Sequence, residues 1–192
     1  MGLLDWIKGR GESDQDRRLR HWRAAWRDAS RNPGNGGVER LRSELDAMGL
    51  SEDDVEIERE MLEGLGRLSE LTKLAEDGPL PAVETGHRAV GSDTCHFTAP
   101  ASMPDEPSQP SGRLLLTSSR AIFLGGTGAT AGWHTLGEAM HADRDVLLVR
   151  HDKQRLYRFR CNTYGDAMEG AFLAARLIKR RRAAAGRQSP GA

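Results

Sequence analysis

Two short apolar runs separated by a polar turn constrain this chain more than any other feature. Residues 112–125 read Gly-Arg-Leu-Leu-Leu-Thr-Ser-Ser-Arg-Ala-Ile-Phe-Leu-Gly, with Leu114–Leu116 and Ala121–Leu124 on either side of four polar residues that end in Arg120. Apolar runs joined by such a turn are typical of a β-hairpin with one buried face. The sequence therefore predicts an antiparallel sheet in the second half of the chain.

Further strand patterns surround this hairpin, and one amphipathic helix follows them. Alternating side chains predict strands at 94–98, near 129–135 and at 156–161, and the apolar run at 146–150 is expected to form a second hairpin with 156–161. In the last of these strands, Arg158 and Arg160 alternate with apolar residues and are expected on the outer face. The final helix is predicted from about 163 to 182, with a buried stripe of Met168, Phe172, Ala175 and Ile178.

The first 80 residues have the periodicity of helices. The apolar spacing predicts three of them, at about 14–30, 38–48 and 52–76. In the first, Trp22 and Trp26 recur at helical spacing, which favours indoles that anchor the helix on a neighbour. Apolar stripes need a covering partner, so these helices are expected to cover the sheet domain or to pair with a second copy.

The charge is zero overall but unevenly distributed. Residues 37–77 hold 13 acidic and 5 basic residues, whereas residues 143–187 hold 12 basic and 5 acidic residues. The acidic helices would repel phosphate, so we do not expect nucleic acid as a partner. The chain has only two cysteines, which predicts a reducing compartment, and no apolar run is long enough to span a bilayer, so we expect a cytoplasmic location. The high arginine content is typical of bacterial proteins.

Basic residues concentrate on the predicted hairpin around Asp152 and at the end of the last helix. One interpretation is a surface for anions or for an anionic membrane at its inner face. The other is that these cations complement the helix dipole, remain solvated, or pair with the acidic helices. The candidate binding surface is Arg150, Lys153, Arg155, Arg158, Arg160, Lys179 and Arg180.

A glycine-rich stretch offers the main enzymatic alternative. Residues 126–131, Gly-Thr-Gly-Ala-Thr-Ala, match the dinucleotide fingerprint, and Asp145 follows at about the expected distance. However, the preceding strand already belongs to a hairpin and the following residues are poor helix formers, so a turn between antiparallel strands is favoured. No pair of Cys or His residues has a zinc-binding spacing, so we predict no metal, no cofactor and no catalytic residue.

The second half of the chain resembles the GRAM and pleckstrin-homology-like families. The resemblance rests on Gly112-Arg-Leu-Leu-Leu-Thr117 followed by Arg120-Ala-Ile-Phe-Leu-Gly125, and it covers residues 84–182. It implies a small antiparallel barrel or sandwich capped by a C-terminal helix, used for binding lipids or proteins. Lipid-binding members of these families have Lys and Arg residues in the loop between the first two strands. In this chain that loop is Pro100–Ser111, and its only charged residues are Asp105 and Glu106.

Together these patterns predict an α+β protein with a helical region at 1–80, a sheet domain at 84–182 and a flexible tail at 183–192. The expected function is a non-enzymatic binding module, most simply a protein–protein adaptor. Peripheral binding to anionic lipid through the basic hairpin and a nucleotide-dependent enzyme remain as alternatives. A homo-oligomer formed through the N-terminal helices is also compatible with the pattern.

Overall fold

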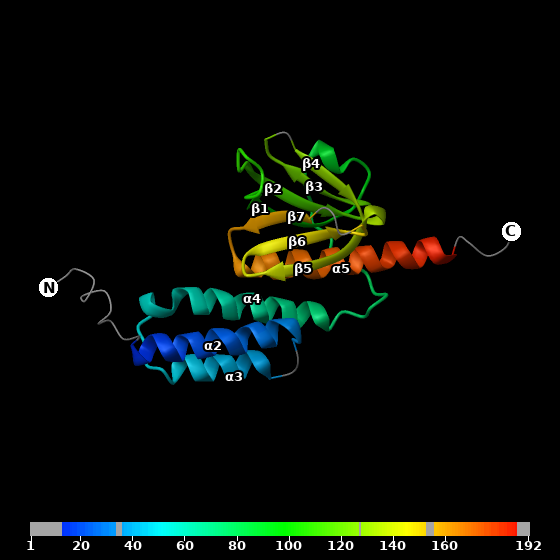
Figure 1. The fold of residues 1–192 in the computed structure, drawn as a ribbon. Helices are drawn as coiled ribbons and strands as arrows, with labels where there is room; N and C mark the ends of the chain where they lie inside the picture. Colours follow the sequence, from blue (N-terminus) through cyan, green and yellow to red (C-terminus); the bar gives the residue numbers. More distant parts are fainter. Residues whose placement is uncertain (1–12, 34–35, 127, 153–155, 188–192) are drawn as a thin grey trace. The chain divides into compact units, whose positions relative to one another are not determined.

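The fold is α+β, with a helical region followed by an antiparallel sheet and a final helix, as expected (Figure 1). The computed structural model describes residues 13–33, 36–126, 128–152 and 156–187. The chain divides into two compact units, Met1–Ser69 and Glu70–Ala192. This division falls within the last turn of a helix, before residue 80, where the sequence pattern places the end of the helical region.

Among its described residues, unit 1 has the α-helices α2 (Asp14–Arg31), α3 (Gly37–Asp46) and α4 (Glu56–Thr72), with a short 3₁₀ helix η1 (Asp53–Val55) before α4. Ser13 starts α2 with a capping box, because its hydroxyl accepts a hydrogen bond from the backbone N–H of Asp16 at 3.0 Å. The three predicted helices are therefore present, but α4 begins later and ends earlier than the pattern at 52–76 predicts.

The two indoles anchor α2 as the spacing predicts. Nε1 of Trp22 donates to the carbonyl of Leu41 in α3, and Nε1 of Trp26 donates to the carbonyl of Met61 in α4, each at 2.8 Å. Both indoles are buried. Arg23 adds an ion pair to Glu58, 2.5 Å away, whose side chain is only 1% exposed. Arg23 contacts Glu58, and three residues later in each helix Trp26 contacts Met61, so α2 and α4 run in the same direction.

Unit 2 is built on one seven-stranded antiparallel sheet in the order β4-β3-β2-β1-β7-β6-β5. Strands β4 and β5 form its two edges, so the sheet is not closed into a barrel. The elements are β1 (Cys95–Ser102), β2 (Ser111–Thr117), β3 (Arg120–Leu124), β4 (Ala129–Gly132), β5 (Leu136–Ala142), β6 (Asp145–Arg150) and β7 (Leu156–Cys161), with 3₁₀ helices η2 (Arg88–Val90) and η3 (Trp133–Thr135) between them.

The hairpin of β2 and β3 has the predicted position. Leu114 pairs with Phe123 and Leu116 pairs with Ala121 across the ladder. The fully buried Thr117 organises the turn, because its hydroxyl accepts hydrogen bonds from the backbone N–H groups of Ser119 and Arg120. Its carbonyl also accepts a hydrogen bond from Nε1 of Trp133, which ties the turn to η3. The turn therefore fixes the register of the strands on both sides.

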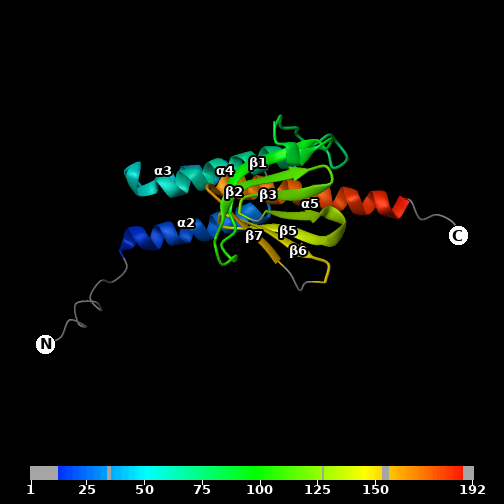
Figure 2. The same ribbon diagram turned by 90° about the horizontal axis from the view of Figure 1, so that it is seen from above.

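Helix α5 (Tyr164–Arg187) packs across one face of the sheet (Figures 1 and 2). Two predictions about it are wrong. Phe172 is only half-buried and Ala175 is exposed, because the buried stripe is rotated toward Ala171, Ala174 and Ile178. The tail predicted from 183 is helical to Arg187, since the run of Arg and Ala that follows Ile178 has high helix propensity.

Candidate functional site

The solvent side of strands β5–β7 carries an apolar cluster, which we call the outer face. It consists of Met140, Leu147, Val149 and Leu156. In the sheet register, Met140 pairs with Leu147, and Val149 pairs with Leu156. Leu147 and Val149 are two residues apart on β6, so all four side chains lie on the same side of the sheet. The buried residues Val146, Leu148 and Phe159 alternate with them and face the core under α5.

The outer face is accessible. Met140 is 38% exposed and Leu156 is 47% exposed, while Leu147 and Val149 are partly exposed. Isolated apolar side chains on a surface are common, but a contiguous group on one side of a sheet is typical of an interaction site. Strand β6 is therefore apolar on both sides: Val146 and Leu148 face the core, and Leu147 and Val149 lie on the outer face.

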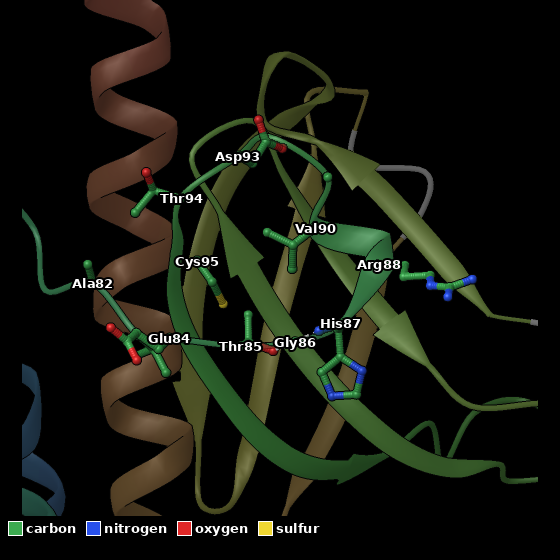
Figure 3. Close-up of a pocket in the computed structure, with 12 residues that line it drawn as sticks. Ala82, Glu84, Thr85, Gly86, His87, Arg88, Val90, Asp93, Thr94 and Cys95 are labelled. Carbon is green, nitrogen blue, oxygen red and sulfur yellow. Dashed lines mark hydrogen bonds between the residues drawn. The ribbon is translucent and has the colours of Figure 1, made fainter.

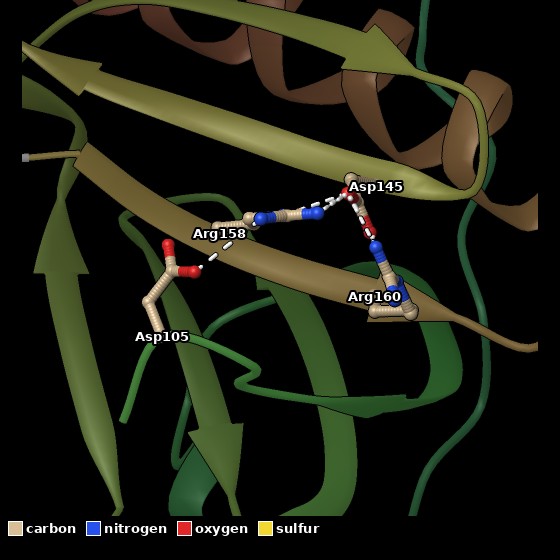
Figure 4. A network of polar contacts seen from close by, with 4 residues as sticks. All are labelled: Asp105, Asp145, Arg158 and Arg160. Carbon is tan, nitrogen blue, oxygen red and sulfur yellow. Dashed lines mark hydrogen bonds and ion pairs between the residues drawn. The ribbon is translucent and has the colours of Figure 1, made fainter. Parts of the chain in front are cut away.

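An ionic cluster borders the outer face, with Asp145 at its centre (Figure 4). Asp145 is 5% exposed and lies opposite Arg160 in the β6–β7 ladder. Arg160 donates through Nε to Asp145 at 2.9 Å, and Arg158 donates through Nε to the same carboxylate at 2.7 Å. Asp105, in the loop between β1 and β2, adds a further contact to Arg158 at 3.4 Å. Both arginines thus contact Asp145, and Arg158 also contacts Asp105.

The surroundings of Asp145 stabilise its ionised form. Burial alone would raise the pKa of this carboxyl, but the hydrogen bonds and positive charges of Arg160 and Arg158 outweigh burial and hold the pKa below its usual value. Asp145 is therefore ionised near neutral pH, and the two carboxylates balance the formal charge of the two guanidinium groups.

The remaining residues of the predicted basic surface lie in different settings. Arg150 forms an ion pair with Asp152 at 3.3 Å. Lys153 and Arg155 lie outside the described residues. On α5, Lys179 pairs with Glu76, and Arg180 donates to the carbonyl of Gly78. Lys179 and Arg180 therefore bind the start of unit 2, before β1, whereas Arg158 and Arg160 border the outer face.

Sequence reasoning identified Arg158 and Arg160 but missed the apolar residues beside them. A signal was present in the uninterrupted run Val146-Leu-Leu-Val149. A strand buried on one side only alternates apolar and polar residues, so an uninterrupted apolar strand indicates a second apolar surface. The contribution of Met140 depended on the register between β5 and β6, which the sequence does not specify.

Apart from the outer face, a concave region of about 570 Å³ is lined by residues between Ala82 and Cys95, most of them in the segment before β1 (Figure 3). The backbone N–H of Val83 donates to the carbonyl of Cys95 at 2.8 Å, so the two ends of this segment meet. Asp93 accepts hydrogen bonds from the hydroxyls of Thr117 and Ser119, and Arg120 donates to the carbonyl of Ala89. These contacts fasten the segment to the β2–β3 turn.

The thiol of Cys95 in this region makes a structural contact. The thiol of Cys95 donates to the carbonyl of Phe97 at 3.2 Å, and burial raises the pKa of Cys95 above its usual value. Elsewhere, burial and the charges of Asp166 and Asp145 raise the pKa of Cys161 to about 12. Both cysteines are therefore held as neutral thiols, which are weak nucleophiles.

The second half of the glycine-rich stretch, from Ala129 on, belongs to strand β4, which pairs antiparallel with β3. Before this strand, the N–H of Gly128 donates to the carbonyl of Gly125 at 2.8 Å, as in a hairpin turn. The dinucleotide motif requires a helix at this point so that the helix N-terminus faces the phosphates. In the loop between β1 and β2, the residues Pro104-x-x-Pro107-x-x-Pro110 form successive turns, because the N–H of Glu106 donates to the carbonyl of Met103 and that of Gln109 to the carbonyl of Glu106.

Within the parts of the chain that the structure describes, no three His, Cys, Asp or Glu side chains are arranged to hold a metal ion. No helix in those same parts combines the length and apolar character needed to cross a membrane.

Comparison with known proteins gives little guidance to function. No family model matches the chain. No curated protein is significantly similar to it. Among solved structures, the C-terminal domain of an unknown protein from Leishmania infantum is similar over 47% of this chain and 89% of its own length, at 9% identity and a TM-score of 0.39. A likeness this distant carries no information about function.

Proposed function

We propose that this chain is a non-enzymatic protein–protein adaptor that binds a protein partner through the outer face of β5–β7. The observation that carries the proposal is the contiguous, accessible group of Met140, Leu147, Val149 and Leu156 on the solvent side of the sheet. The PH-like resemblance belongs to the same proposal, since an antiparallel sheet with one final helix is compatible with it.

The composition of the outer face favours a protein over a lipid surface. Protein interfaces combine an apolar centre with a polar rim and are enriched in Met and Arg. Here the apolar group is bordered by Arg158 and Arg160, whose charges are balanced by Asp145 and Asp105. Attraction to anionic lipid needs an excess of positive charge, and this cluster supplies little.

Site-specific photocrosslinking tests the proposal. A photoreactive phenylalanine derivative replaces Met140 or Leu156 in the full chain, and the cells of origin are irradiated. The matched control carries the same group at Thr130, an exposed residue of β4. We expect a protein adduct of the same mass from positions 140 and 156 but not from position 130.

Charge substitution on the outer face provides the second arm of this test. The double variant Met140→Glu and Leu156→Glu should lose the partner, whereas Thr130→Glu should retain it. Equal capture at all three positions would contradict the proposal. Binding to vesicles of anionic phospholipid at low salt, abolished by Arg158→Glu and Arg160→Glu in the absence of any protein adduct, would favour the lipid alternative instead.

A further inference from the structure

A groove opens in unit 1 between the first turns of α2 and the end of α3. Its volume is about 580 Å³, within the range of ligand-binding clefts. Its apolar lining comes from Trp22, Ala47 and Met48, and its charged lining comes from Arg17, Arg18, His21 and Glu44. The hydrogen bond from Trp22 to Leu41 fixes the indole in the groove wall. The groove is therefore a preformed apolar site with mainly basic surroundings.

The same unit presents a feature that is complementary to this groove. Ile57, in the first turn of α4, is 47% exposed although it is a large aliphatic side chain. Asp53, Asp54 and Glu60 lie about one helical turn before or after it, so they share its side of the helix. We call this group the Ile57 patch. It offers one apolar side chain surrounded by carboxylates.

The groove and the Ile57 patch lie at the same end of unit 1. Helices α2 and α4 run in the same direction, because Arg23 contacts Glu58 and Trp26 contacts Met61. The start of α4 is therefore at the end where α2 starts, and this is also where the groove opens. A two-fold contact requires two complementary surfaces close together on one subunit, so that each can meet its counterpart on the other.

We infer that two copies of this chain pair through unit 1, with Ile57 of each copy entering the groove of the other. In this arrangement Asp53, Asp54 and Glu60 of one copy face Arg17 and Arg18 of the partner copy. The apolar contact provides the attraction, and the opposite charges fix the orientation. An interface of one side chain and a few ion pairs on each side is small, so the association is weak and depends on protein concentration and on salt.

Sedimentation of the full chain at concentrations up to about 100 μM tests this inference. We expect the wild-type chain to form a dimer within this range, and the variant Ile57→Asp to remain a monomer. Leu50→Asp, a partly exposed residue outside the groove and the patch, is the matched control and should dimerise as the wild type does. Circular dichroism and thermal melting show whether each variant is folded.

A charge exchange makes the test specific for the two surfaces. One variant carries Arg17→Glu and Arg18→Glu in the groove, and the other carries Asp53→Arg and Glu60→Arg in the patch. Each alone places like charges opposite one another and should be monomeric. Mixed together, they restore both contacts with opposite charges and should form a heterodimer.

The outcomes are distinct from those of the outer-face experiment, because no residue is shared between the two surfaces. A chain that stays monomeric over the whole concentration range would overturn the inference. A dimer that Ile57→Asp leaves intact, or a mixture of the charge variants that fails to associate, would overturn it as well.

Discussion

Asp145 accepts a hydrogen bond from Arg160 at 2.9 Å, directly across the ladder between β6 and β7. Arg158 donates to the same carboxylate, so the two arginines that the sequence marks as a basic surface are neutralised within the sheet. This pairing changes the character of the hairpin. The surface that this hairpin presents to solvent is the apolar outer face, and the paired charges of Asp145, Arg158 and Arg160 lie at the edge of that face.

Removing the carboxylate of Asp145 should change how the free energy of unfolding depends on pH. The folded-state pKa of Asp145 lies below its unfolded value of about 3.9. The stability contributed by the ionised form is therefore fully present above that value and is lost as the pH falls through the folded-state pKa. Asp145→Asn should lower the free energy of unfolding by about 2 kcal/mol at neutral pH, and the difference from the wild type should shrink below about pH 4.

Urea denaturation at several pH values measures this effect. Asp143→Asn is the matched control, since it removes an exposed carboxylate from the neighbouring β5–β6 turn. We expect the control to change stability by less than about 0.5 kcal/mol. An Asp145→Asn variant whose deficit stays constant from neutral to acidic pH would contradict the ionic interpretation.

The ion pair between Arg23 and Glu58 in unit 1 should contribute to the free energy of unfolding. Glu58 is 1% exposed and accepts from Nε of Arg23 at 2.6 Å, so its removal leaves a partly buried guanidinium without this partner. Glu58→Ala should lower the free energy of unfolding by about 2–3 kcal/mol. Glu56→Ala, an exposed position in the same turn, should change it by less than about 0.5 kcal/mol. A double-mutant cycle with Arg23→Ala isolates the pair, and a coupling energy near zero would show that the ion pair does not stabilise the unit.

The helices and strands of this chain were largely predictable because their patterns are local. The indoles of α2 and the alternating Arg158 and Arg160 occupy the faces that their spacing indicates. The outer face was not predictable, because Met140 joins Leu147 only through the pairing of two strands. The groove was missed for the same reason, since Trp22 and Glu44 come from different helices. Patterns within one element specify which side is buried, but sites between elements depend on register and packing.

The turn between β2 and β3 should depend on one hydroxyl. Thr117 accepts from two backbone N–H groups and donates to Asp93 at 3.0 Å, and it is fully buried. Thr117→Val keeps the shape but leaves these groups unpaired, so the free energy of unfolding should fall by about 1–3 kcal/mol. Thr130→Val, at an exposed position of β4, should leave stability within about 0.5 kcal/mol of the wild type. Similar stabilities of the two variants, measured by thermal melting, would show that the hydroxyl does not organise the turn.

Close packing of α5 on the sheet depends on Gly170. A Cβ atom at this position would lie 3.1 Å from the ring of Phe97 and 3.3 Å from Val146, which leaves no space for a larger side chain. Gly170→Leu should therefore force α5 away from β1 and β6 and lower the free energy of unfolding by about 1–3 kcal/mol.

Gly66 in α4 provides the control for this prediction, because nothing lies within 4 Å of the corresponding Cβ position. Gly66→Leu should retain or raise stability, since Leu favours the helical conformation over Gly by several tenths of a kcal/mol. Both variants gain the same helix propensity, so the difference between them reports the contact of α5 with Phe97 and Val146. If urea denaturation gave Gly170→Leu the same stability as Gly66→Leu, the close approach of α5 to the sheet would not be required for the fold.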